Sequence, residues 1–271
     1  MTRARTDARP DAIETAMSTL TVAAPPTLRP DVLVEVGLLD RYAPIDSPIG
    51  PLFVAWNGRG VSLVDSATDD IESFAIRHRA TTGRPTERAD ALPPRLADAI
   101  DRRLDGDRRV RIDLDLRGHS AFEQDVWLKA LEIPRGEVRP YGWVAAEIGR
   151  PRAVRAVGTA LGHNPVPLIV PCHRVVRTDG SIGQYSLGGP ANKRTILAAE
   201  GLDPDGMEDA ARRGERLIGC ASTHIVCWPS CRTGRRMLAR NRRPFRSLAD
   251  AAQAGYRPCK VCRPVAVTAA A

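Results

Sequence analysis

Residues 168–175 read LIVPCHRV, and this stretch decides both the fold and the chemistry expected of the chain. The apolar run over residues 168–170 predicts an extended buried segment, so the Cys172 thiol should emerge at its end. His173 and Arg174 follow at once, and neighbouring cations stabilise a thiolate, which is the nucleophilic form of cysteine. Taken alone, this pair is more often an inert buried cysteine. Loops at residues 164–167 and 183–189 favour the nucleophile, because a core cysteine does not need them.

The segments around this stretch are predicted to be helical. Ser120 is predicted to cap a helix with one apolar face, and this helix should end before Pro134. Two short helices, joined by residues 149–152, have the dimensions of a helix-turn-helix, and an ordinary helical hairpin fits the same pattern. These two helices are predicted at residues 141–148 and 153–161, a further helix at 191–200, and a linker at 201–207.

A small α/β unit is predicted before these helices, over residues 31–116. Apolar runs at residues 52–56 and 61–64 flank Asn57-Gly58, which is a hairpin signal. Helical spacing is found at residues 71–79 and 96–104, and residues 110–116 alternate strictly, as in a half-buried strand. Residues 1–30 are rich in Ala, Thr, Arg and Pro without sustained periodicity, and they read as a flexible extension.

The charge of the chain is concentrated at its end. Of the 271 residues, whose net charge is +8, residues 207–271 hold 13 Lys and Arg against 4 acidic residues, whereas the rest hold 27 against 28. A basic segment of this kind favours a polyanionic partner, first of all nucleic acid, with a solvated basic surface as the alternative. No run approaches the roughly 18 apolar residues of a membrane helix, and no secretory signal is recognisable. A reducing, cytoplasmic setting is therefore expected.

The basic tail also carries a pattern of metal ligands. Cys227-x3-Cys231 and Cys259-x2-Cys262 are close pairs that can place four thiolates around Zn²⁺. The segment has few large apolar side chains, so a metal would contribute much of its folding free energy. Disulfides are the alternative, which the reducing setting disfavours. Cys220 and His224 lie nearby, and we expect them to be spectators rather than ligands.

Several motifs in one order resemble a known family. The stretch from Phe122 to Gly201 is similar to the active-site domain of the O6-alkylguanine-DNA alkyltransferases, and residues 42–116 resemble that family's N-terminal domain, most clearly at residues 46–52. The motifs are Ile133-Pro134-x-Gly136, Tyr141-Gly142, Ala153-Val154-Arg155-Ala156-Val157-Gly158, Gly162-x-Asn164-Pro165, Val170-Pro171-Cys172-His173-Arg174-Val175 and Glu200-Gly201.

The resemblance implies an α/β plus α fold class in several parts. A ribonuclease-H-like α/β domain is expected at residues 31–117 and a winged-helix-like, DNA-binding active-site domain at 118–203. The flexible extension at 1–30 precedes them, and a small zinc-binding module at 204–271 follows.

The resemblance also implies the catalytic roles. Cys172 would be the nucleophile, activated through a water by His173, with Glu200 orienting the histidine. Asn164 would order the active-site loop by hydrogen bonds. Tyr141 would donate a proton toward the departing guanine.

Further residues would hold the substrate. Arg155 would enter the duplex in place of the extruded nucleotide, and Arg174 and Tyr141 would contact DNA. Pro171, Val175 and Tyr185 would line the alkyl pocket.

The implied activity is DNA repair by an enzyme that works once. An alkyl group moves irreversibly from guanine O6, or from thymine O4, in double-stranded DNA to the cysteine, because the resulting thioether offers water no carbonyl to attack. No cofactor is required for this step. The expected partner of the chain, which we expect to be a monomer, is alkylated duplex DNA.

The tail resembles a second family, the zinc domain of the Ada adaptive-response protein. The similarity lies in Cys227-Trp228-Pro229-Ser230-Cys231, residues 247–255 and Gly255-Tyr256-Arg257-Pro258-Cys259-Lys260-Val261-Cys262. It implies that Cys227 is both a ligand and a candidate second methyl acceptor, from DNA phosphotriesters; a zinc module that only holds DNA is the alternative. In Ada this domain stands first and a regulatory region follows; here it stands last, so transcriptional activation is not expected.

Two rival functions remain open from the residues. A non-enzymatic DNA-binding damage sensor or regulator would use the same helix-turn-helix and zinc module. A cysteine hydrolase would also use Cys, His and Glu, and multiple turnover would distinguish it.

Overall fold

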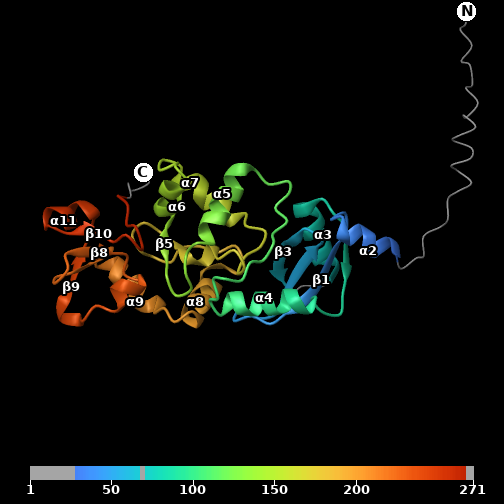
Figure 1. The fold of residues 1–271 in the computed structure, drawn as a ribbon, viewed down its shortest axis with the longest axis horizontal. Coiled ribbons are helices and arrows are strands. Elements are labelled where there is room, and N and C mark those ends of the chain that lie inside the picture. The colour runs from blue at the N-terminus through green and yellow to red at the C-terminus, as the bar shows by residue number, and fades with distance from the viewer. Residues whose placement is uncertain (1–27, 68–70, 267–271) are drawn as a thin grey trace, which may run out of the picture.

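The computed structural model describes residues 28–67 and 71–266. Three units follow one another along its long axis in chain order, an N-terminal unit (residues 28–116), a central unit (121–203) and a tail unit (204–266) (Figure 1). One cluster of buried apolar side chains continues through all three. The predicted extension at residues 1–30 lies outside the described residues as far as residue 27, and its last three residues begin a helix.

The N-terminal unit is a mixed sheet with helices. The strand order is β3-β2-β1-β4, antiparallel except for the parallel pair β1 and β4, and the predicted hairpin is confirmed as β2 and β3. Strand β2 is buried on both faces, because Phe53 and Ala55 pack toward α3 while Leu52, Val54 and Trp56 join the main core. The elements are α2 (Leu28–Glu35), β1 (Asp40–Ile45), β2 (Leu52–Asn57), β3 (Gly60–Ser66), α3 (Ile71–Thr82), β4 (Thr86–Arg88) and α4 (Pro94–Leu104).

A buried polar cluster holds this unit together at Asp40. The Asp40 carboxylate accepts hydrogen bonds from Ser62, Asn57 and Arg84 and lies 2.8 Å from His78 Nε2. Every polar group of the cluster has a partner, as burial requires. The cluster therefore has a structural role.

The predicted strand at residues 110–116 is wrong. Only Leu114 forms an isolated bridge, to Val61 of β3, and the segment is otherwise irregular. Asp115 turns inward and accepts hydrogen bonds from Asn57 and Arg117, which ends the alternation that the sequence shows. The segment connects two units instead of extending a sheet.

The central unit is built from short helices around the conspicuous cysteine. Ser120 and Glu123 form a reciprocal capping box on α5, and the indole of Trp127 donates to the Ala160 carbonyl of α7 at 2.7 Å. The predicted helices are confirmed with small shifts of their ends. The elements are α5 (Ala121–Ala130), β5 (Arg139–Pro140), α6 (Tyr141–Glu147), α7 (Val154–Gly162), the 3₁₀ helix η1 (Cys172–Arg174), β6 (Val175–Val176) and α8 (Gly189–Ala199).

The predicted extended segment before Cys172 is also wrong. Residues 168–170 are buried, but Leu168 has a φ of 75° and only Pro167 and Val170 form an isolated bridge. A left-handed residue cannot continue a strand. Cys172 therefore begins a 3₁₀ helix at the end of a buried turn.

The tail unit is a small sheet with short helices. The strand order is β10-β8-β7-β9. The linker predicted at residues 201–207 is shorter than expected, because Asp203 caps α9 and the helix begins at Pro204. The elements are α9 (Pro204–Arg212), β7 (Leu217–Cys220), β8 (Ile225–Cys227), α10 (Arg232–Arg235), the 3₁₀ helix η2 (Ala239–Asn241), β9 (Arg242–Phe245), α11 (Leu248–Gln253) and β10 (Arg257–Pro258).

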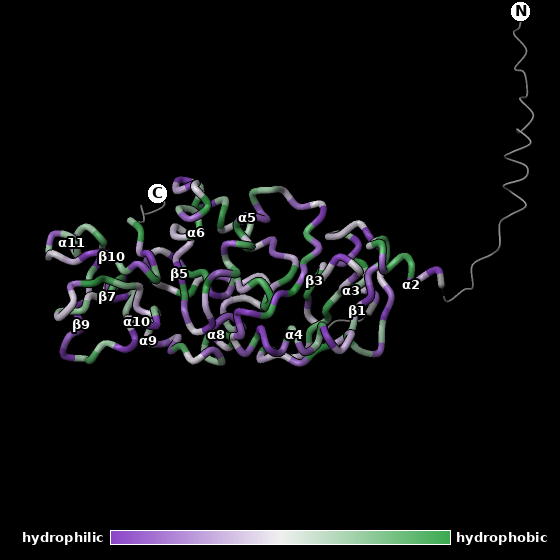
Figure 2. The backbone as a smooth tube through the Cα atoms, in the orientation of Figure 1, coloured by the Kyte–Doolittle hydropathy of each residue, from purple (hydrophilic) through white to green (hydrophobic). Residues whose placement is uncertain are grey.

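The fold as a whole is a mixed α/β fold. Hydrophobic and hydrophilic stretches are interspersed along the backbone of all three units (Figure 2). Among the residues that the structure describes, every helix is too short or too polar to cross a lipid bilayer.

Candidate active site and metal centre

Cys172 is held at the start of η1 by the loop that precedes it. The Asn164 amide donates to the Cys172 sulfur and to the Val170 carbonyl, both at 3.1 Å, while its oxygen accepts the Val166 N–H. One buried side chain thus fixes both the thiol and the turn of the chain around it. This agrees with the loop-ordering role expected of Asn164.

The environment keeps the Cys172 thiol protonated at rest. Burial raises the pKa of Cys172, and the Asn164 N–H and the positive charge of Lys193 offset this only in part. A base must therefore remove the proton before the sulfur can act as a nucleophile.

His173 has the properties of such a base. Its Nε2 lies 2.9 Å from Glu200 Oε1, and Nδ1 is buried with no hydrogen-bond partner among the described residues. Burial lowers the pKa of His173, an effect that Glu200 offsets only in part, so the ring is neutral near pH 7. If Nε2 donates its proton to Glu200, the Nδ1 lone pair is left available to accept one.

Glu200 is the centre of a buried ionic cluster. It accepts from Arg174 at 2.7 Å and from the Gly136 N–H at 3.1 Å, in addition to its contact with His173. Burial would raise the pKa of Glu200, but the hydrogen bonds from His173 and Arg174 outweigh it and hold the pKa at about 2. Glu200 thus stays ionised and orients the histidine.

Arg174 belongs to the same buried ionic cluster. Its guanidinium is buried, pairs with Glu200 and donates to the Ile133 carbonyl at 2.8 Å. These buried partners give Arg174 a positioning role behind the histidine. A direct contact of Arg174 with DNA stays a prediction.

The ionised state of Glu200 predicts a loss of stability in acid. Because the folded pKa of about 2 lies below the ordinary 4.5, the stabilisation of about 3 kcal/mol is complete above pH 4.5 and disappears as the pH falls toward 2. We expect about 2 kcal/mol of it to be lost by pH 3. Urea unfolding at pH 7 and pH 3 should show this loss in the wild type and not in Glu200→Gln. The exposed Glu72→Gln is the control and should follow the wild type; an equal loss in Glu200→Gln would contradict the assignment.

Lys193 of α8 was missed by the sequence analysis. Its ammonium is buried and donates to the carbonyls of Val175 at 2.6 Å and Gln184 at 3.2 Å, and burial lowers the pKa of Lys193 to about 8. It ties β6 to the loop that carries Tyr185. A signal was present, since helical spacing puts Lys193 on the same face as the buried Ile196 and Leu197.

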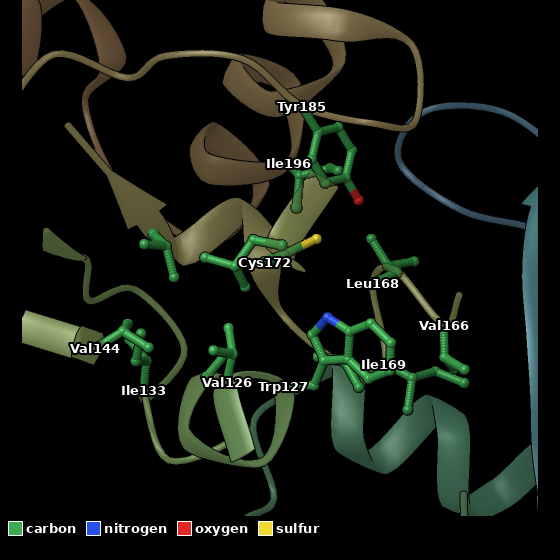
Figure 3. Close-up of a cluster of buried hydrophobic side chains, with 14 of the residues drawn as sticks. Val126, Trp127, Ile133, Val144, Val166, Leu168, Ile169, Cys172, Tyr185 and Ile196 are labelled. Carbon is green, nitrogen blue, oxygen red and sulfur yellow. The ribbon is translucent and has the colours of Figure 1, made fainter. Parts of the chain in front are cut away.

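A pocket of about 190 Å³ opens onto the sulfur. Figure 3 shows the Cys172 sulfur and the Tyr185 ring facing the same space, and Tyr185 also meets His173 edge-on with ring centroids 6.2 Å apart. The residues lining the pocket are Tyr141, Gly158, Leu161, Gly162, Cys172, Gln184, Tyr185 and Ser186. Burial raises the pKa of both Tyr141 and Tyr185, so both hydroxyls stay protonated near pH 7 and can donate hydrogen bonds.

The remaining residues expected at this site fall into two groups. Arg155 is exposed on α7, the helix that contributes Gly158 and Gly162 to the pocket. Pro171 and Val175 are buried beside Cys172 and do not line the pocket. Of the predicted pocket residues, only Tyr185 therefore faces it.

The four paired cysteines of the tail unit come together. The sulfur atoms of Cys227, Cys231, Cys259 and Cys262 all lie within 4.8 Å of one another and are buried. A tetrahedral zinc site with Zn–S bonds near 2.3 Å needs sulfur atoms roughly 3.8 Å apart, so the cluster fits Zn²⁺. The Trp228 N–H also donates to Cys262 at 3.4 Å, as thiolate ligands require.

The neighbours of this cluster are not ligands in the structure. Cys220 contacts the Ser222 hydroxyl at 3.3 Å, and the His224 ring packs on Tyr256. Neither belongs to the cysteine cluster.

Comparisons with known proteins agree with both sites. A family model described as "6-O-methylguanine DNA methyltransferase, DNA binding domain" matches residues 121–202, and one described as "Metal binding domain of Ada" matches residues 207–265. A methylated-DNA--protein-cysteine methyltransferase of Mycobacterium bovis is 39% identical over 160 residues, which is 59% of this chain and 92% of that protein.

Two further matches are a curated protein and a solved structure. The regulatory protein ada of Salmonella typhimurium is 38% identical over 149 residues, 55% of this chain and 42% of that protein. A crystal structure of Mycobacterium tuberculosis OGT in complex with DNA has a TM-score of 0.48 and 35% identity, covering 59% of this chain and 93% of that one.

Proposed function

The chain belongs to the methylated-DNA--protein-cysteine methyltransferase family, and from this premise we propose that Cys172 is the residue that accepts the alkyl group. The protein is a DNA-repair enzyme that transfers an alkyl group from O6-alkylguanine to one of its own cysteines. The observation that carries the assignment is the Cys172 thiol at a pocket, with the His173–Glu200 pair behind it. Of the described cysteines it is the one that lines this pocket.

The transfer begins with the removal of a proton. A water passes the thiol proton of Cys172 to Nδ1 of His173, while Glu200 accepts the hydrogen bond of Nε2 and stabilises the imidazolium that forms. Asn164 donates to the sulfur and stabilises the thiolate.

The bond exchange follows at the alkyl carbon. The sulfur lone pair forms the S–C bond as the C–O6 bond breaks. The electron pair of the C–O6 bond passes to the guanine, which takes a proton from the Tyr141 hydroxyl. Tyr185 packs beside the alkyl group. The product is a thioether, so the enzyme cannot be regenerated by hydrolysis. Each molecule should therefore react once.

The target base must leave the duplex to reach this pocket. An O6-alkyl group of a stacked base cannot present its backside to a buried sulfur, so the nucleotide is extruded, and Arg155 on α7 takes its place in the stack. Contacts to the DNA phosphates supply affinity and salt dependence. The DNA partner is a duplex, and the chain acts on it as a monomer in a cytoplasmic setting.

A burst experiment tests the function. When the protein is incubated with excess duplex DNA that carries a labelled O6-methylguanine, the label on Cys172 should rise to one equivalent. Transfer should then stop, because the thioether is stable. A DNA-binding sensor without activity would take no label, and a cysteine hydrolase would turn over an ester or amide many times. Either result would overturn the proposal.

The Arg155 proposal predicts a difference between two substrates. Extrusion costs a few kcal/mol, so Arg155→Ala should slow transfer from duplex DNA by about 10- to 100-fold. Transfer from the free base O6-methylguanine should be unchanged, because nothing has to be extruded. Single-turnover rates on both substrates measure this, with the exposed Arg152→Ala as control. An equal loss on both substrates would place the defect in the pocket instead.

The tail unit adds a metal-binding module to the enzyme. Cys227, Cys231, Cys259 and Cys262 would hold Zn²⁺, which supplies a tetrahedral cross-link between the two cysteine pairs. Methyl acceptance by Cys227 from phosphotriesters stays a prediction, and the Cys227 side chain is fully buried. We also propose a finer fold, with a ribonuclease-H-like domain at 31–117, a winged-helix-like domain at 118–203 and the zinc module at 204–271, after an extension at 1–30.

A further inference from the structure

Among its contacts with the central unit, the tail unit holds residues 137–147 at both ends. Ser230 lies between the two cysteines of the first pair, and its buried hydroxyl accepts the Val138 N–H at 2.9 Å and donates to the Val138 carbonyl at 3.2 Å. The N–H of Arg232, just after that pair, donates to the Glu137 carboxylate at 2.9 Å. Residues next to the first cysteine pair thus bind the start of the segment, through the backbone of Val138 and the side chain of Glu137.

The second cysteine pair grips the other end of the segment. Arg263 follows Cys262 directly, and its guanidinium pairs with Glu147 at 2.8 Å and lies over the Trp143 ring, 5.8 Å from its centroid. Arg263 has a φ of 45°, which residues other than glycine seldom adopt. The Arg263 side chain is 49% exposed, so its pair with Glu147 and its contact with Trp143 are surface contacts that link the second cysteine pair to α6.

A buried ion pair carries these contacts toward the nucleophile. Glu137 pairs with Arg139 at 2.5 Å, with both side chains almost fully buried. Arg139 opens β5, which pairs in parallel with β6 in the register Arg139 to Val175. Strand β6 begins immediately after Cys172–Arg174. The gripped segment is therefore bonded to the chain next to the reactive thiol.

The segment also carries a residue of the pocket. Tyr141 is the first residue of α6 and lines the space in front of the Cys172 sulfur. Helix α6 has 7 residues, and Pro140 at its N-cap makes no side-chain capping bond. So short a helix has little stability of its own, and its position depends on what packs against it. Here the tail unit is one of its neighbours.

We propose that the tail unit is a positioning element for alkyl transfer: Ser230, Arg232 and Arg263 hold residues 137–147 so that the Tyr141 hydroxyl stays aligned over Cys172. The inference rests on the proposed function and adds to it a role for the tail unit at the O6-alkylguanine site itself. The two cysteine pairs bring Ser230 and Arg263 to the interface, so the metal centre supports the active site without touching it.

A pair of double variants isolates this contact. Ser230→Ala/Arg263→Ala removes a hydroxyl and a charge at the interface, and Ser222→Ala/Arg257→Ala makes the same changes at exposed positions of the same unit. The interface variant should keep its zinc and its half-saturating DNA concentration, and should transfer methyl about tenfold more slowly at saturating duplex. The control should match the wild type. A wild-type rate in the interface variant would overturn the proposal.

A double-mutant cycle with Tyr141→Phe separates positioning from general damage. If the interface acts through the Tyr141 hydroxyl, the interface substitutions should cost less than twofold in the Tyr141→Phe background. An undiminished tenfold loss there would overturn the proposal. Arg263→Lys in the Ser230 wild-type chain should keep most of the rate, because it keeps the charge that pairs with Glu147.

Amide exchange gives a readout that needs no DNA. The Val138 N–H should exchange faster in the interface variant than in the control, with the core amides of the N-terminal unit unchanged, and equal protection would contradict the proposal. The two hypotheses fail differently. A wild-type chain that takes no label at Cys172 defeats the proposed function and this inference together, whereas equal rates in wild type and interface variant defeat this inference alone.

Discussion

Cys172→Ser should reduce methyl transfer from O6-methylguanine DNA by on the order of 10⁴-fold or more. A serine hydroxyl at this position has nearly the same shape and can still accept the Asn164 N–H, but its far higher pKa leaves His173 unable to generate the anion. The structure should therefore survive while the chemistry stops. Mass spectrometry of the protein after incubation with excess methylated duplex measures the adduct at this position.

The control for this substitution is Cys220→Ser. Cys220 belongs neither to the pocket nor to the cysteine cluster, so its replacement should leave the full single equivalent of methyl on Cys172. Peptide mapping of the same samples also reports on Cys227, since a phosphotriester methyl would appear there independently. Undiminished label in Cys172→Ser would remove the central assignment.

Cys259→Ser should unfold the tail unit. Structural zinc sites contribute apparent binding free energies of about 10–16 kcal/mol, and a serine in place of one thiolate gives up the ligand that joins β10 to β8. The tail sheet has short strands and several exposed arginines, so it has little apolar core with which to replace the metal. We expect zinc content to fall from one equivalent to below about 0.2 and the amides of β7 to β9 to lose their protection.

Metal analysis and amide exchange decide this prediction together. Cys220→Ser is again the matched control, because Cys220 lies in the same unit outside the cluster, and it should keep one zinc. One equivalent of zinc in Cys259→Ser would rule out coordination by four thiolates. Chelation of the wild-type protein should reproduce the exchange pattern of Cys259→Ser.

Features of the sequence that depend on near neighbours were predicted well. The Asn57-Gly58 turn fixed the hairpin of β2 and β3, and Ser120 with Glu123 marked the start of α5. The spacing of the cysteine pairs predicted the metal cluster, and the resemblance around Cys172 identified the family. These features follow from turn geometry, helix capping and ligand spacing, which act over a few residues or are written into a motif.

Features that depend on distant partners were missed. Residues 110–116 alternate like a strand, yet Asp115 turns inward to partners from β2 and beyond, so no ladder forms. Arg174 was predicted as a DNA contact, and its burial and pairing were missed because Glu200 approaches it from the end of α8. Lys193 was overlooked because its two carbonyl acceptors lie in other segments.

The sequence by itself determined the kind of chemistry, through its resemblance to a known family, and the four cysteines that cluster in the tail, because motifs and short-range spacing carry that information. The tertiary structure decided which charges are buried, how the pocket is lined and where the tail unit docks. Contacts such as Ser230 with Val138 join residues 92 positions apart. No periodicity or motif encodes such a pairing, since it exists only once packing has brought the two segments together.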